Sequence, residues 1–397
     1  EPLDQLLSKG ETSKEVYVLR RLHDEQGDAG LGLHFDLTVP FARYVLENAG
    51  KLEFPFRRYQ IQKVWRGERP QEGRFREFTQ ADIDIVAKDE LPFHFDVEIA
   101  QVMAEAMSGL PVPALTLQIN NSKILEGFYL GLGVTEPAAV MRIVDKLDKV
   151  PGDKVLELLG TDGGLTPEQA EKCLALAQIN APDASFVEQV RALGVEHELL
   201  DTGLAELAEV MDTVTSSGSV TVMADLRIAR GLDYYTGTVF ETQMAGFEHL
   251  GSICSGGRYD QLASDGKNTY PGVGISLGVS RLLVPLITKN GLVADRSVPS
   301  TVLVALVDEE SRSLSMETAQ KLRARGIPTE VAASAQKFGK QIRYAERRGI
   351  PFVWFPPVAD ANHGVRDIRT AHQVDADPDT WNPPTEDLTP SIKEQLT

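Results

Sequence analysis

The chain has 397 residues, 42% of them hydrophobic, and a formal net charge of −18. This length is enough for a large hydrophobic core and predicts two or three domains. The acidic excess argues against a protein that binds nucleic acid over its whole surface, because the two partners would repel each other.

Three features indicate where the protein works. No run of eighteen apolar residues is present, so the sequence predicts no membrane span. The first residues lack the apolar core of a signal peptide, and the missing initial methionine leads us to expect a chain that has lost its beginning. The two cysteines, Cys173 and Cys254, are too few for a disulfide framework or a cysteine zinc site. We therefore expect a cytoplasmic, reduced protein.

The first 120 residues mix strand-like and helical runs. Residues 56–67 and 75–87 alternate with period two and are joined by a loop with Pro and Gly, which predicts a long antiparallel hairpin. Its polar face is arginine-rich on the first strand and acidic on the second. Residues 96–107 have the pattern of an amphipathic helix.

Helical periodicity dominates residues 121–215, where Thr166 and Pro167 suit an N-cap and a first helical turn. We expect a helical insertion between two β-rich segments. Strands return at 219–226, 238–244 and 251–257, followed by a helix that begins near Val279.

The pattern changes again after residue 300. Three short apolar strands, "STVLVALV", "IPTEVAA" and "IPFVWF", are separated by two helix-length segments, which predicts parallel strands with crossover helices. Gly326 and Gly349 suit the left-handed position that follows a helix. The tail after Pro356 is rich in Asp and Pro, and its structure is left open.

Two local segments are basic. Residues 57–76 carry seven Lys or Arg against two Glu, and residues 336–349 carry five against one. A charge cluster is usually a solvated surface, but two of them on an acidic chain indicate a polyanionic ligand. In the second segment Lys340, Arg343 and Arg347 fall on one helical face.

The hairpin carries candidate binding residues. Arg66 is close to Glu68, Arg69, Arg74 and Arg76, and a guanidinium can hold a phosphate or carboxylate through two parallel hydrogen bonds. An isolated exposed arginine is more often a solubility feature. The returning strand presents polar side chains that suit an ammonium, an imidazole or a magnesium ion beside phosphates: Gln80, Asp82 and Asp84.

A second cluster lies in "RGLDYYTGTVFE", residues 230–241, which we interpret as a β-hairpin. It combines Arg230, Asp233, Tyr234 and Tyr235, although Asp233 could simply pair with Arg230 and the tyrosines could be half-buried sheet residues. "CSGGRYD" supplies paired glycines, and "GVGISLGVSRL" places Arg281 near the start of a helix without the lysine of a phosphate loop. Three separated arginines on an antiparallel sheet suggest a nucleoside triphosphate site.

These segments resemble the histidyl-tRNA synthetase family of class II aminoacyl-tRNA synthetases. "FRRYQIQKVWRGERPQEGRFREFTQADIDIV" and "GVGISLGVSRL" are similar to the second and third class signatures, and "ARGLDYYTGTVFE", "SGGRYD" and "LHFDLTVPFARY" to family segments. The resemblance implies an α+β catalytic domain with an antiparallel sheet in residues 1–120 and 216–290. It also implies a helical insertion at 121–215 and an α/β anticodon-binding domain at 300–397.

The resemblance implies activation of histidine by ATP to histidyl-adenylate, followed by transfer to the 3′ end of histidine tRNA. Arg66 and Arg230 would stabilise the α-phosphate and carboxylate through the attack, and Arg281 would bind the γ-phosphate. Glu68 would belong to the ATP site, and Mg²⁺ is expected with ATP, its ligands being left open. The ammonium group of histidine would be bound by Asp36, Thr38 and Gln80. Its imidazole would be bound by Asp84 and Tyr235, and Tyr234 would line the pocket.

The same resemblance implies contacts with tRNA and with a second subunit. Arg69 and Gln71 would face the acceptor end, and Lys340, Arg343 and Arg347 the anticodon stem. A homodimer is expected of the complete chain, although the first class signature, which builds that interface, would lie upstream of residue 1.

Three alternatives stay open. A non-catalytic regulatory subunit of an ATP phosphoribosyltransferase shares the fold but usually lacks the histidine signatures and the C-terminal domain. A synthetase for threonine or proline shares the C-terminal module but not "RGLDYYTG". A plain RNA-binding scaffold would not need an acidic, tyrosine-rich pocket.

Overall fold

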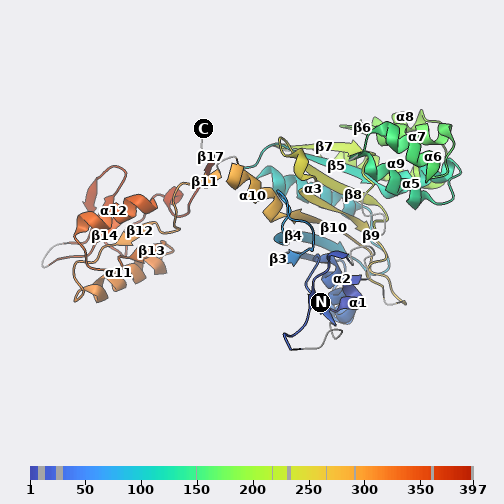
Figure 1. Ribbon diagram of the computed structural model, residues 1–397. Helices are drawn as coiled ribbons and strands as arrows, with labels where there is room; N and C mark the ends of the chain where they lie inside the picture. The colour runs from blue at the N-terminus through green and yellow to red at the C-terminus, as the bar shows by residue number, and fades with distance from the viewer. Residues whose placement is uncertain are drawn as a thin grey trace. The chain divides into compact units, whose positions relative to one another are not determined.

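The computed structural model describes residues 1–7, 14–23, 30–148, 150–216, 218–229, 234–264, 266–289, 292–358 and 362–394. The chain forms two compact units, Glu1–Pro285 and Leu286–Thr397, which are considered separately (Figure 1). No helix in these described ranges is both long and apolar enough to cross a membrane.

An eight-stranded sheet forms the centre of the first unit, in the order β3-β4-β10-β9-β8-β5-β7-β6. Among the described strands of this sheet only β5 and β7 pair in parallel, so the predicted antiparallel sheet is confirmed with one exception. Its strands have the following bounds: β3 Phe56–Trp65, β4 Glu77–Val86, β5 Leu115–Asn121, β6 Asn180–Ala181, β7 Val220–Asp225, β8 Thr238–Met244, β9 Cys254–Tyr259 and β10 Gly272–Gly278.

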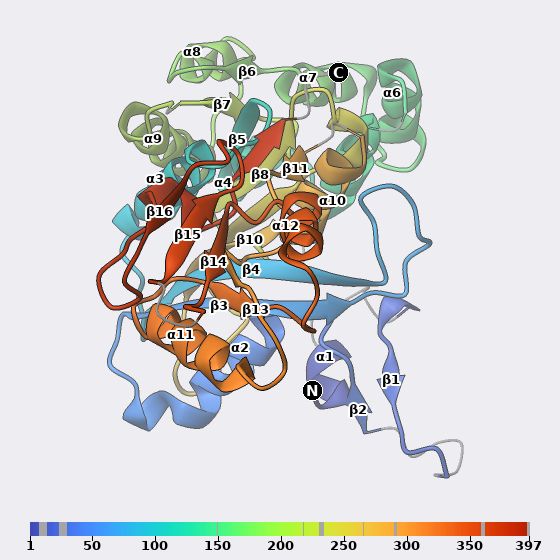
Figure 2. The same cartoon turned by 90° about the vertical axis from the view of Figure 1, so that its left-hand side faces the viewer.

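Strands β3 and β4 form the predicted hairpin, with Phe56 opposite Val86 and Trp65 opposite Glu77 (Figure 2). Its polar face is the enclosed one: Asp82 is 3% exposed, whereas Tyr59 on the other face of β3 is 80% exposed. The period-two pattern therefore located the faces correctly, but the buried face is the hydrophilic one. A sheet that buries carboxylates and exposes a tyrosine is built for a ligand rather than for stability.

Helices cover both faces of this sheet. On the face opposite the buried carboxylates, Asp96 of α3 (His94–Ser108) forms a buried ion pair with Arg258 of β9, 2.7 Å from Oδ2 to Nη2. On the other face, α2 (Thr38–Asn48) packs its Phe41 and Val45 beside β3 and β4. Shorter elements near the N-terminus are α1 Leu3–Leu7, β1 Val18–Leu19, β2 Leu31–Gly32 and η2 Ala49–Lys51.

In its described residues, the predicted helical segment contains six α-helices. They gather beside β6 and β7 (Figure 1): α4 Ser122–Gly131, α5 Pro137–Val144, α6 Gly152–Thr161, α7 Pro167–Ala177, α8 Phe186–Arg191 and α9 Glu198–Thr213, with η3 Asp145–Asp148. Thr166 caps α7 in a capping box with Gln169, as expected from the sequence. Gly127 and Gly203 allow α4 and α9 to pack backbone to backbone. The domain boundaries themselves stay predictions.

Of residues 230–241, which the sequence led us to interpret as a hairpin, the structure describes 234–241, and these contain one strand only. The strand before this stretch, β7, and the strand within it, β8, are not neighbours, because β5 lies between them. Residues 234–237 are instead a connection into β8, and Arg230 and Asp233 lie outside the described residues. Paired β-strands leave a local pattern in the sequence, but their order in the sheet does not.

The second unit contains a five-stranded sheet in the order β13-β12-β14-β15-β16. As predicted, β12 (Val302–Val304), β13 (Thr329–Val331) and β14 (Phe352–Phe355) are parallel, with crossover helices α11 (Arg312–Ala324) and α12 (Phe338–Arg348). Gly326 and Gly349 have φ values of 79° and 75°, which confirms the predicted left-handed conformation after each helix.

The tail after Pro356 completes this sheet. Strand β15 (Gly364–Asp367) pairs antiparallel with β14, and β16 (Gln373–Asp375) pairs antiparallel with β15. In a separate two-stranded sheet, β17 (Ile392–Glu394) pairs antiparallel with β11 (Leu292–Ala294). Three further helices connect strands of the two units. They are η4 (Glu248–Leu250) in the first unit, α10 (Val279–Lys289), which begins in the first unit, and η5 (Thr385–Asp387) in the second. All three residues of β16 are exposed, so no apolar alternation marked it in the sequence.

Candidate active site

A row of polar side chains crosses the first sheet on its carboxylate face. Paired residues of neighbouring strands share a face, so the strand register places these side chains in line. From β3 to β5 they are Gln60, Asp82, Ser276, Ser255, Glu241 and Gln118. Six adjacent strands thus contribute one polar residue each to a common floor.

Beside one end of this floor lies a hollow that we call the arginine pocket. Its lining includes predicted residues from the hairpin, its loop and α10: Arg66, Glu68, Arg74, Gln80 and Arg281, together with Ser252, Ser255 and Ser276. Residues 208 positions apart in the sequence meet here, since Arg281 Nε donates to the carbonyl of Gly73 at 3.0 Å. The structure therefore brings together the predicted Arg66, Glu68, Gln80 and Arg281.

Arg66 directly follows β3 and is held on three sides. Its guanidinium lies 4.5 Å from the ring centre of Phe35 and 5.2 Å from that of Phe78, and its Nε donates to the carbonyl of Phe35 at 3.2 Å. Two aromatic rings and a carbonyl restrict its orientation before any ligand arrives. Such preorganisation is what an anion-binding arginine needs.

Arg281 is fixed by two backbone carbonyls. Besides its contact with Gly73, its Nη1 donates to the carbonyl of Ser252 at 2.8 Å. The side chain thereby ties the loop between β3 and β4 to the segment before β9. Glu68 lies between two cations, 3.9 Å from Arg66 and 3.4 Å from Arg74.

A second hollow, which we call the tyrosine pocket, adjoins the first and shares Ser255 and Ser276 with it. It brings together four predicted residues from three distant segments of the sequence, Thr38, Asp84, Tyr234 and Tyr235. Asp82 and Tyr259 complete its polar lining. The two pockets therefore lie side by side on the floor of the sheet.

Asp84 is held from two sides by residues that the sequence analysis missed. Arg58 Nη2 lies 2.7 Å from its Oδ2, and the hydroxyl of Tyr259 donates to its Oδ1 at 2.8 Å. A Cβ at Gly274 would come within 2.2 Å of Oδ1, so a glycine is required opposite this carboxylate. The period-two alternation of β3 places Arg58 on the same polar face as Gln60, and this pattern could have identified Arg58 as a residue of the site.

The tyrosines of the connection before β8 are closely packed. The ring centres of Tyr234 and Tyr235 are 4.1 Å apart. Burial, the neighbouring Tyr234 and the nearby Asp84 raise the pKa of Tyr235 well above its usual value, so its hydroxyl stays protonated. A Cβ at Gly257 would come within 2.8 Å of the Tyr235 ring, which explains one glycine of the "SGG" segment.

Asp36 and Asp82 are further buried carboxyls of the site. Asp36 is 5% exposed and accepts a hydrogen bond from the backbone N–H of Val39 at 3.0 Å, so it also helps to start α2. Burial, followed by the charge of Asp84, raises the pKa of Asp82 to about 7. Asp82 is therefore a buried acid that changes its protonation near neutral pH.

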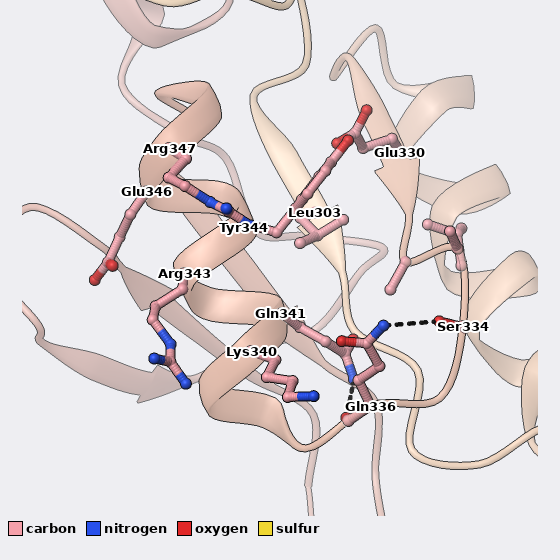
Figure 3. Close-up of a pocket in the computed structure, with 13 residues that line it drawn as sticks. Leu303, Glu330, Ser334, Gln336, Lys340, Gln341, Arg343, Tyr344, Glu346 and Arg347 are labelled. Carbon is pink, nitrogen blue, oxygen red and sulfur yellow. Dashed lines mark hydrogen bonds between the residues drawn. The ribbon is translucent and has the colours of Figure 1, made fainter.

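The predicted tRNA-contact residues fall in two places. Arg69 and Gln71 are exposed in the loop between β3 and β4. In the second unit, Lys340, Arg343 and Arg347 line a pocket of about 630 Å³ between α12 and the end of β13 (Figure 3). Tyr344 and Gln341 line the same pocket, which offers an aromatic ring and an amide beside the cations.

The structure does not test two predictions about the site, the role of Arg230 and the presence of magnesium. Arg230 lies outside the described residues. Within the described ranges, no group of three or more His, Cys, Asp and Glu side chains is arranged to hold a metal ion.

Comparison with known families identifies the chain. Residues 1–282 match the histidyl-tRNA synthetase family, and residues 301–355 match the anticodon binding domain. The chain belongs to the histidyl-tRNA synthetase family. It is 57% identical to the histidine–tRNA ligase of Cutibacterium acnes over 405 residues, covering 99% of this chain and 89% of that protein. It is 56% identical to that of Micrococcus luteus with the same coverage of both.

Solved structures agree with this family. The histidyl-tRNA synthetase of Nostoc sp. PCC 7120 superposes with a TM-score of 0.80 and 32% identity, covering 95% of this chain and 87% of that one. A Bacillus halodurans protein described as an ATP phosphoribosyltransferase regulatory subunit/histidyl-tRNA synthetase is 21% identical with a TM-score of 0.69, over 87% of this chain and 85% of that one. That likeness shows the fold alone. The predicted fold class and the predicted activity, ligation of histidine to tRNA, are confirmed.

Proposed function

We propose that the two adjoining pockets bind the substrates of this histidine–tRNA ligase side by side, histidine in the tyrosine pocket and ATP in the arginine pocket. The observation that carries this proposal is the position of Asp84. A carboxylate held by Arg58 and Tyr259 lines the same pocket as two tyrosines, and this pocket adjoins one lined by arginines. A nitrogen-bearing side chain and an anionic phosphate would each meet complementary groups.

In the tyrosine pocket, Asp84 and Tyr235 would bind the two imidazole nitrogens of histidine. Asp84 accepts from an N–H, and the protonated Tyr235 hydroxyl can donate to the other nitrogen. Tyr234 would line the pocket. An apolar amino acid would leave these buried groups without partners, which gives strong discrimination. The ammonium group would be received by Asp36, Thr38 and Gln80.

In the arginine pocket, Arg66 would bind the α-phosphate of ATP and the histidine carboxylate during the attack that forms histidyl-adenylate. Arg281 would bind the γ-phosphate, and Arg230 would approach from the other side. No side chain acts as a nucleophile, so the rate enhancement comes from positioning and from charge stabilisation. Mg²⁺ would arrive with the ATP phosphates, where Glu68 is the nearby acidic side chain.

The second step would transfer histidine to the terminal adenosine of its tRNA. We assign the acceptor end to the exposed Arg69 and Gln71 and the anticodon stem to Lys340, Arg343 and Arg347. Their positive charges would offset the acidic balance of the whole chain where the RNA phosphates approach. We expect the complete protein to be a homodimer that acts in the cytoplasm.

ATP–pyrophosphate exchange with each of the twenty amino acids tests this proposal on the full-length protein. Exchange with histidine alone is expected, and Asp84→Asn should abolish it, because the amide alters both the charge and the hydrogen-bond polarity that face the imidazole. Binding of histidine without exchange would instead favour a regulatory subunit. Exchange with threonine or proline would refute the assignment of the tyrosine pocket.

A further inference from the structure

Three side chains form a hydrogen-bonded chain on the floor between the two pockets. Ser276 Oγ donates to Asp82 Oδ1 at 2.5 Å and accepts from Gln80 Nε2 at 2.6 Å. Asp82 is 3% and Gln80 7% exposed, and both come from β4, while Ser276 comes from the adjacent strand β10. These three residues are called the relay below.

The polarity of the relay follows from its donors and acceptors. An ionised carboxylate only accepts hydrogen bonds, and a serine hydroxyl has one proton. Ser276 must give that proton to Asp82, so toward Gln80 it can only accept. The amide of Gln80 is therefore held with Nε2 toward Ser276 and Oε1 on the opposite side.

The Oε1 atom of Gln80 is buried and has no hydrogen-bond partner among the residues that the structure describes. A buried acceptor without a partner is costly unless a ligand supplies a donor. An ammonium group, which only donates, is complementary to it. If the amide turned around, its NH₂ group would face the ammonium and the hydrogen bond would be lost.

We propose that Asp82 is a positioning residue, which acts through Ser276 to hold the amide oxygen of Gln80 toward the ammonium group of histidine. This inference rests on the proposed function, in which Gln80 contacts that group. It gives Asp82 a role although its carboxylate need not touch the substrate.

A purely structural role explains Asp82 less well. Its burial disfavours the charged form, which raises its pKa to about 7, so ionised Asp82 destabilises the fold. The charged and titratable groups that face it come from four segments: Asp84 on β4, Arg58 on β3, Cys254 and Tyr259 on β9, and Asp36 before α2. Only Arg58 among these favours the ionised form.

The test compares Asp82→Ala, Ser276→Ala and the double variant in histidine-dependent pyrophosphate exchange. Each single variant should raise the KM for histidine about tenfold, the loss of one hydrogen bond to a charged group. Asp82 does not line the arginine pocket, so Asp82→Ala should leave the KM for ATP nearly unchanged. The double variant should be no worse than either single one, because both changes break the same relay. Glu77→Gln removes an exposed carboxylate from the same strand and is the control.

Gln80→Ala separates this inference from the proposed function. If Gln80→Ala raises the KM for histidine and Asp82→Ala does not, the relay is refuted while the proposed site stands. Equal KM values for Gln80→Ala and the unaltered protein would refute the ammonium contact itself. Additive effects of Asp82→Ala and Ser276→Ala would also overturn the inference, since independent contributions cannot be one relay.

Asp82→Asn supplies a second measurement if the alanine variant does not fold. Protonated Asp82 can donate to Ser276 and release Gln80, so the unaltered protein should gain affinity for histidine as the pH rises from 6 to 8. Asparagine does not titrate. The ratio of the variant's KM to that of the unaltered protein should therefore increase over this range, and the titration of histidine itself cancels in the ratio. A constant ratio would contradict the relay.

Discussion

Arg58 and Asp84 form an ion pair inside the first unit, with 2.7 Å between Nη2 and Oδ2, although their side chains are only 8% and 4% exposed. The guanidinium also lies 4.4 Å from the ring centre of Phe41 on α2. The pair therefore links the hairpin, the wall of the tyrosine pocket and the carboxylate that we assign to the imidazole. Two charges are buried here where a stable core would have none.

Arg58→Ala should destabilise the protein, because it leaves Asp84 buried without its cation. We expect a loss of about 3–5 kcal/mol in the free energy of unfolding of the first unit, measured by urea denaturation. Arg57→Ala is the matched control on the same strand, since Arg57 pairs with Glu98 at the surface and is 53% exposed. A surface pair contributes about 0–1 kcal/mol. Equal effects of the two variants would contradict the importance of the buried pair.

Arg281→Lys should weaken ATP binding and loosen the loop between β3 and β4. A lysine keeps the charge but has a single terminal nitrogen, so it cannot donate to the carbonyls of Gly73 and Ser252 from two spaced nitrogens as Arg281 does. The KM for ATP should rise on the order of tenfold, with faster tryptic cleavage after Arg74, which precedes Phe75 in this loop. Lys289→Ala, at the far end of α10, is the control. Unchanged cleavage would show that Arg281 does not hold the loop.

Asp82→Asn should change how stability depends on pH. Because burial raises the pKa of Asp82 from 3.8 to about 7, the folded state binds a proton that the unfolded state releases above pH 4. This carboxyl therefore lowers the stability as the pH rises from about 4 to about 7, by an amount on the order of 4 kcal/mol. The variant should gain stability over the unaltered protein between pH 5 and pH 8 in thermal unfolding. A parallel pH dependence of the two proteins would be inconsistent with a titrating Asp82.

Arg347→Ala should impair tRNA charging without affecting histidine activation. Arg347 lines the pocket of the second unit, whereas its neighbour Arg348 is not part of that lining. We expect the KM for tRNA to rise several-fold with a weaker salt dependence, because one phosphate contact is lost. Arg348→Ala is the matched control, and pyrophosphate exchange should stay normal in both variants. Identical tRNA kinetics for the two variants would argue against the proposed role of this pocket.

Local sequence patterns predicted helices and strands well in two situations. In one, only one face of the element is buried; in the other, a capping residue or a glycine marks the end of a helix. The capping box at Thr166, the glycines after α11 and α12, and the alternation of β3 and β4 all act over a few residues. Strand β16 was not predicted, because its residues are exposed and show no apolar alternation. In the stretch interpreted as a hairpin, the described residues 234–237 are a connection, and β8 pairs instead with β5, more than a hundred residues upstream, and with β9.

The sequence by itself determined which residue types each of the two pockets would contain, since residue types and short spacings indicate an arginine cluster and a cluster of acidic residues and tyrosines. Only the tertiary structure decided how they meet. Ser276 reaches Asp82 across 194 residues, and Tyr259 reaches Asp84 across 175. Pairing between β4, β10 and β9 creates both contacts. Strand register is set by packing over the whole sheet, so residues that are distant in the sequence carry no local sign of the partners they meet.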